Sequence, residues 1–163
     1  MLLNLQSSTF PMKMVYLLSH ELEMNPEHMA LTQALTLDKS RPGMGLNGTH
    51  GLFGSREWWD SIEQGRIPLL FLSGIIKRAY VAGQDPSRFN NSIELQLNDG
   101  STQDIGIYVN NKKDARLFKA GCFVSIVYAL DEFKPGAVRN FGNKHHQITL
   151  EMAVSLEPVE TKS

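Results

Sequence analysis

Alternating apolar and polar side chains mark two neighbouring strands in the second half of the chain. Residues 92–97 place three aliphatic side chains on one face and Glu94 and Gln96 on the other, which is the period of a half-buried strand. Residues 104–109 repeat the pattern, with isoleucine at 105 and 107. The Asn-Asp-Gly sequence at 98–100 favours a tight turn between them. The pattern therefore predicts an antiparallel pair.

Longer apolar runs predict three further strands at residues 69–81, 122–133 and 147–156. Gly74 lies in the middle of the first run, where a strongly coiled strand needs to bend. Asn110 or Asn111 favours the start of a short helix through Lys119, and Gly121 favours its end. The expected order is three strands, one helix and two strands.

The N-terminal third predicts helices and a flexible connector. Asn25 and Pro26 favour a helix start, with apolar positions extending to Leu37. A glycine-rich stretch, 42–54, follows. Ser55 is a favourable cap for a short helix at 56–64 that carries Trp58 and Trp59, and we expect this helix to plug one end of the β-structure. Residues 1–24 show little periodicity, so we expect a loosely ordered arm, and Met29 offers an alternative start.

The order β-β-β-α-β-β and the glycine in the long first strand resemble the oligonucleotide/oligosaccharide-binding (OB) fold. The resemblance is at the level of the fold, and it implies a mainly β protein with a five-stranded barrel. We therefore divide the chain into an N-terminal arm and glycine-rich connector (1–54), a capping helix (55–68), an OB-like barrel (69–157) and a tail (158–163).

Composition indicates one domain, in which positive charge is concentrated in one segment while the whole chain is nearly neutral. The 163 residues, 42% of them apolar, suffice for one sizeable core plus an arm. The net charge of −1 gives no general attraction to nucleic acid, yet residues 110–146 hold seven Lys and Arg against three Asp and Glu. Cys122 is the only cysteine, which excludes an intrachain disulfide. The N-terminus is a poor signal peptide and no run reaches the roughly 20 apolar residues of a membrane span. We expect a cytoplasmic protein.

The resemblance implies a ligand site between the loops at 82–91 and 134–146. The second loop combines cations with an aromatic ring, as single-strand binders do, because cations neutralise phosphates and rings stack on bases. Glu94 and Asp104 on the adjoining strands would oppose a phosphate backbone. The first hypothesis is a non-enzymatic module that binds single-stranded nucleic acid, with these candidate ligand-binding residues: Arg88, Phe89, Tyr108, Lys134, Arg139, Phe141 and Lys144.

The alternative is a protein-interaction or assembly module. In this interpretation the Trp58-Trp59 helix and the apolar N-terminal arm dock onto a second copy or another protein. The sequence contains no catalytic signature, so both hypotheses describe a protein that is not an enzyme.

The remaining motifs favour structural roles. Gly43, Gly45 and Gly48 have the spacing of a dinucleotide fingerprint, but no strand precedes them, which favours a connector. The adjacent pair at 145–146 is the only histidine pair, and neighbours on an extended chain point apart. Cys122 has the position of a buried thiol, and the acids at 57, 60 and 63 suit a solvated helix face. We expect no metal and no cofactor.

Overall fold

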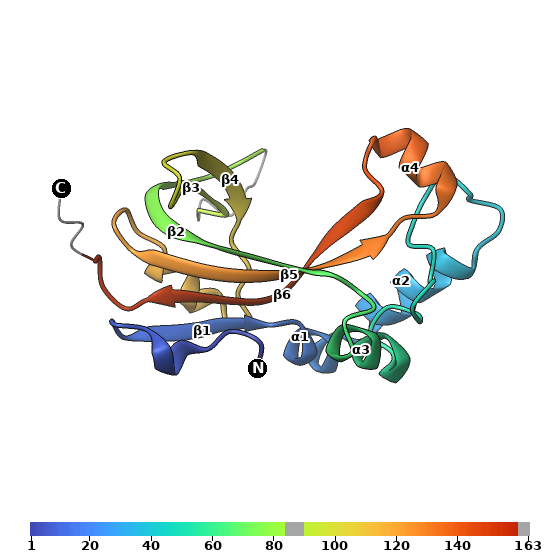
Figure 1. The fold of residues 1–163 in the computed structure, drawn as a ribbon, viewed down its shortest axis with the longest axis horizontal. Coiled ribbons are helices and arrows are strands. Elements are labelled where there is room, and N and C mark those ends of the chain that lie inside the picture. Colours follow the sequence, from blue (N-terminus) through green and yellow to red (C-terminus); the bar gives the residue numbers. More distant parts are fainter. Residues whose placement is uncertain (84–89, 160–163) are drawn as a thin grey trace. The chain divides into compact units, whose positions relative to one another are not determined.

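The computed structural model describes residues 1–83 and 90–159 and is mainly β, as expected (Figure 1). The strands are β1 (Met12–Leu17), β2 (Leu69–Tyr80), β3 (Ser92–Leu97), β4 (Thr102–Gly106), β5 (Phe123–Glu132) and β6 (His145–Ser155). The helices are α1 (Leu18–Met24), α2 (Pro26–Leu37), α3 (Arg56–Glu63) and α4 (Pro135–Phe141), with two short 3-10 helices, η1 (Leu5–Ser7) and η2 (Lys112–Leu117). Among the described residues, no helix is long and apolar enough to cross a bilayer.

The six strands form one open sheet in the order β1-β6-β5-β2-β3-β4. The prediction of a closed, five-stranded OB-like barrel is therefore wrong. The five expected strands are present as β2 to β6, and the turn at 98–100 joins β3 to β4 as predicted. Closure would require β4 to pair with the outer edge of β6. That edge is occupied by β1, which runs antiparallel to β6 from Met12 opposite Ser155 to Leu17 opposite Glu151.

Strand β1 and helix α1 lie where the sequence suggested a loosely ordered arm. Asn110 binds the backbone of β1 near the end of the strand. Its carboxamide accepts from the Leu17 N–H at 2.8 Å and donates to the Leu17 carbonyl at 3.2 Å, while its own backbone N–H donates to Val15 at 2.9 Å. Asn110 therefore takes the hydrogen bonds that another strand would make, which blunts this edge against unwanted pairing.

The described residues group into two compact units, and β2, β5 and β6 contribute residues to both. Unit 1 comprises Met1–Leu17, Phe71–Val127 and Thr149–Ser163. Its core includes the alternating positions that the sequence predicted, among them Ile93 and Leu95, both fully buried. Gly74 is required because a Cβ there would overlap the Gln96 carbonyl oxygen on β3.

Strand β6 is buried on both faces within unit 1, and one of the buried side chains is charged. The carboxylate of Glu151 accepts from the backbone N–H groups of Leu2 and Leu3, at 2.7 and 2.8 Å. These paired hydrogen bonds compensate for removing the charge from water and fix the N-terminal segment onto the sheet.

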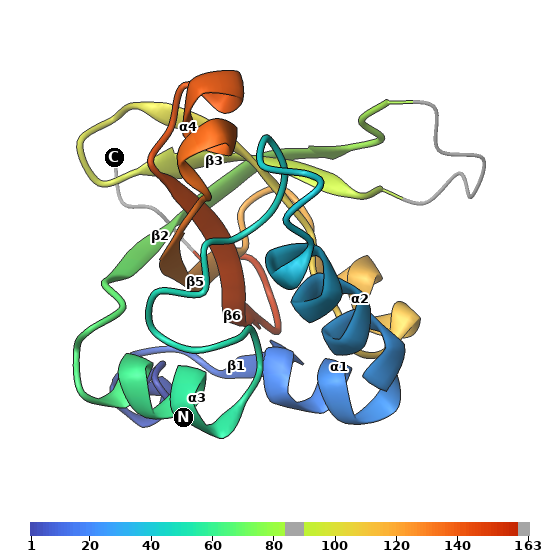
Figure 2. The ribbon, with the colours of Figure 1, turned by 90° about the vertical axis from the view of Figure 1, so that its right-hand side faces the viewer.

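Unit 2 comprises Leu18–Leu70 and Tyr128–Ile148 and contains all four α-helices; α1 and α2 contact each other (Figure 2). Ser55 caps α3, as predicted, by accepting from the Trp58 N–H at 3.2 Å. Trp58 is fully buried, edge-on to Phe53 at 5.1 Å. Its indole N–H donates to a carboxylate oxygen of Asp131 at 2.9 Å.

The segment 134–146, predicted as a loop, contains helix α4. Pro135 stands at its first position and Gly142 ends it in the left-handed conformation, with φ of 73°. The proline needs no hydrogen-bond partner at a helix start, and the glycine accepts this backbone without strain, so both residues favour this short helix.

Candidate functional site

Lys134, predicted to contact phosphate, lies in the interior of unit 2. Its side chain is buried, and the ammonium donates to the carbonyls of Leu35, Asp38 and Arg41 at 2.6, 3.1 and 3.2 Å. These carbonyls belong to the last turn of α2 and the chain just after it, where a helix carries a partial negative charge, and each also accepts from the backbone N–H three residues further on. Lys134 therefore caps α2.

The other candidates from the same segment are exposed. Arg139 lies in the last turn of α4, and Lys144 immediately precedes β6. Phe141 stacks on Phe133 with ring centroids 5.3 Å apart, and the opposite neighbour of Phe133 is His146, at 5.2 Å. The structure thus brings Arg139 and Phe141 onto one short helix, with Phe141 partly covered by an aromatic neighbour.

The remaining candidates are Tyr108, Arg88 and Phe89. Tyr108 belongs to unit 1, where its ring contacts that of Tyr16 at 5.5 Å. Arg88 and Phe89 lie outside the described residues.

The acids on the expected binding face are engaged in contacts within the sheet. The Tyr80 hydroxyl donates to Asp104 at 2.8 Å, and this bond raises the pKa of Tyr80. Arg78 makes an ion pair with Glu94 at 3.5 Å and lies 4.4 Å from the centre of the Tyr80 ring. The contacts join β2, β3 and β4 in one cross-strand row, which stabilises the sheet surface.

The Trp58–Asp131 pair is the most buried polar contact of unit 2. Burial raises the pKa of Asp131, although the hydrogen bonds from Trp58 and from the Glu132 N–H, the latter at 2.9 Å, both lower it. The sequence signal that could have indicated this pair is an acid near the end of a mostly apolar strand. Because Trp58 is fully buried, it contributes to the core rather than to an exposed surface.

Within the described ranges, 1–83 and 90–159, no group of three or more His, Cys, Asp or Glu side chains has an arrangement that could hold a metal ion. Cys122 is a free, buried thiol. The glycines with fingerprint spacing allow close packing: a Cβ at Gly45 would meet Leu35, and one at Gly48 would meet Thr36, both on α2. The connector is therefore a packing element.

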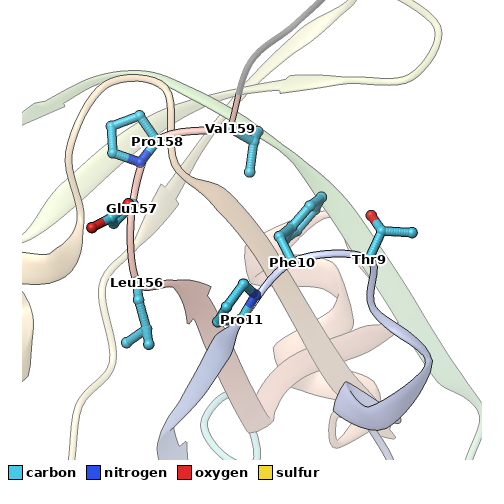
Figure 3. Close-up of a pocket in the computed structure, with 7 residues that line it drawn as sticks. All are labelled: Thr9, Phe10, Pro11, Leu156, Glu157, Pro158 and Val159. Carbon is cyan, nitrogen blue, oxygen red and sulfur yellow. The ribbon is translucent and has the colours of Figure 1, made fainter.

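Unit 1 carries a surface groove of about 650 Å³ between the residues before β1 and those after β6. Thr9, Phe10 and Pro11 line one side, facing the segment Leu156–Val159 across the groove (Figure 3). The two sides are linked by the Leu156 N–H, which donates to the Pro11 carbonyl at 3.1 Å. Glu157 is the only ionisable group among these lining residues, so the groove offers apolar contact and no acid–base pair.

Comparison with known proteins decides between the two functional hypotheses. The sequence model of a family described as "Immunity protein RhsI2" matches residues 12–155. None of the curated proteins matches the chain. Immunity proteins bind and neutralise toxins and are not enzymes, which confirms the non-enzymatic prediction.

The same match corrects the first hypothesis. The prediction of a nucleic-acid-binding module, with its OB-fold classification, is wrong, and the alternative of a protein-interaction module fits better. The partner implied by the family is a protein. Since the match extends over most of the sequence, the chain belongs to the RhsI2 immunity protein family.

Proposed function

We propose that this protein neutralises the toxic part of an Rhs protein by binding to it as an equimolar inhibitor. The observation that carries the proposal is the family match over residues 12–155. An inhibitor of this kind acts by occupancy, so it needs a rigid, complementary surface rather than a reactive group.

The described surface is compatible with that role. Large apolar side chains are exposed in unit 2, among them Leu31 and Leu37. Interfaces between proteins have such apolar residues at their centres. We also propose that binding takes place in the cytoplasm, where the single thiol would stay reduced.

Co-expression with the cognate toxin domain tests the proposal. We expect protected growth, and we expect the purified proteins to form a complex of one copy each in size-exclusion chromatography with light scattering. Calorimetry should give a stoichiometry near one. Protection without a complex, or protection at strongly substoichiometric amounts, would contradict inhibition by occupancy.

A further inference from the structure

We infer that the outer face of α2 is the anchor of the complex and inserts into an apolar groove of the toxin that is rimmed by basic side chains. This inference rests on the proposed function and identifies the surface of this protein that binds the toxin. We call this surface the α2 face. It consists of Met24, the last residue of α1, and of five residues of α2: Glu27, Ala30, Leu31, Ala34 and Leu37.

The α2 face is apolar and exposed. Met24, Leu31 and Leu37 are 72%, 63% and 64% exposed, and α2 contains no buried residue. At about 100° per residue, positions 27, 30, 31, 34 and 37 fall on one side of the helix. Contiguous exposed apolar groups on an ordered helix are typical of a binding surface.

The opposite side of α2 packs on its own unit with both apolar and polar side chains: a Cβ at Gly54 would meet Met29, and one at Gly45 would meet Leu35. Gln33 donates from its side-chain amide to the Phe53 carbonyl at 2.9 Å, and Thr36 lies against Gly48. The helix thus packs on its own unit through half-buried Met29 and Leu35 as well as polar groups, and it still leaves further leucine and alanine side chains exposed to solvent. Folding of unit 2 alone gives no reason for leucines at 31 and 37, whereas an apolar partner does.

The acidic residues at the N-terminal end of the α2 face indicate that the partner's binding site is basic. Glu23 and Glu27 are both exposed, and neither takes part in the ion pairs of the described residues, which join Lys13 to Asp114, Arg41 to Asp38 and Arg78 to Glu94. Glu23 and Glu27 thus place acidic groups beside the exposed apolar side chains. A partner with basic groups around an apolar groove satisfies both features.

The helix is held in place before any partner binds. Lys134 caps its C-terminal end through three carbonyls, and Gln33 and the ring contact of His28 with Phe53, at 5.5 Å, fix its inner side. A preorganised helix loses little conformational freedom on association, so exposed leucines on it contribute more fully to affinity.

The test compares the double variant Leu31→Ala/Leu37→Ala with Phe71→Ala/Leu156→Ala, which removes two exposed apolar side chains from unit 1. Alanine preserves the helix, so circular dichroism should be unchanged. We expect the α2 variant to bind the toxin domain at least tenfold more weakly and the control variant to bind within about twofold of wild type. We expect Glu27→Lys to slow association at low salt and to reduce its salt dependence.

The outcomes separate the inference from the proposed function. Wild-type binding together with unchanged affinity of the α2 variant would overturn the inference and leave the function intact. Absence of any complex with wild-type protein would overturn both. A wild-type dimer that dissociates in Leu31→Ala/Leu37→Ala would identify a second copy as the occupant and would also overturn the inference.

Discussion

Replacing Lys134 by methionine should destabilise unit 2 by removing the cation that caps α2. Methionine keeps most of the aliphatic volume, so the change isolates the ammonium group. The carbonyl oxygens of Leu35, Asp38 and Arg41 each lose the ammonium donor but keep a backbone N–H donor. The loss is therefore that of three hydrogen bonds to a charged donor, at about 1 kcal/mol each, so we expect the free energy of unfolding to fall by about 3 kcal/mol. For a chain of this size that corresponds to a drop of roughly 6–12 °C in Tm.

Urea denaturation followed by circular dichroism measures this loss, and hydrogen exchange locates it. Amides in the last turn of α2 should exchange faster in Lys134→Met than in wild type, because that turn loses its cap. Lys144→Met is the matched control, since Lys144 is exposed and its removal should change the free energy by no more than about 0.5 kcal/mol. A Lys134→Met protein within 0.5 kcal/mol of wild type would refute the reasoning that the buried ammonium stabilises α2.

Three further predictions concern other buried polar contacts. Trp58→Phe should lower the free energy of unfolding by about 3 kcal/mol, because it leaves Asp131 without the indole donor and creates a gap, whereas the half-buried Trp59→Phe should change it much less in the same urea titration. Burial raises the pKa of Asp131 in the folded protein, so protonation of this carboxyl group favours folding. The stabilisation that protonation provides declines as the pH rises from 3.8, the usual pKa of the group, through the raised pKa. Asp131→Asn does not titrate, so its stability relative to wild type should improve over that pH range in a series of urea titrations, and a difference independent of pH would contradict the assignment. Glu151→Gln replaces one of two acceptor oxygens for the Leu2 and Leu3 amides by a donor, so limited proteolysis should cut the N-terminal residues faster than in wild type, and equal rates would count against the anchoring role.

The sequence predicted the central strands because their periodicity reflects burial. Ile93 and Leu95 alternate with polar residues and are fully buried, and Ser55 caps α3 through a local contact that short-range chemistry determines. Features that depend on distant partners were missed. The run Met12–Leu17 has no clean alternation, and its pairing with β6 involves residues nearly a full chain length away. Missing β1 led to the expectation of a closed barrel.

The candidate site was less predictable, because composition does not report whether a charge is already satisfied. Lys134 stands in a basic, aromatic segment, yet its charge is used inside the unit. Arg139 and Phe141 are exposed as expected, but they lie on α4, which Pro135 and Gly142 could have indicated. The helix at Pro26–Leu37 and its apolar positions were predicted, but the sequence did not indicate that Leu31 and Leu37 are exposed.

The position of β6 between β1 and β5 has a consequence for synthesis. Strand β1 is translated early, but its partner residues, 151–155, emerge from the ribosome about 140 residues later. At 5–20 residues per second the first strand waits roughly seven to thirty seconds for its neighbour. During that interval the sheet lacks its second strand and Asn110 has no paired strand to bind. Protection by a newly made molecule therefore begins only once translation has passed β6, so stocks of folded protein, rather than ongoing synthesis, would meet a sudden arrival of toxin.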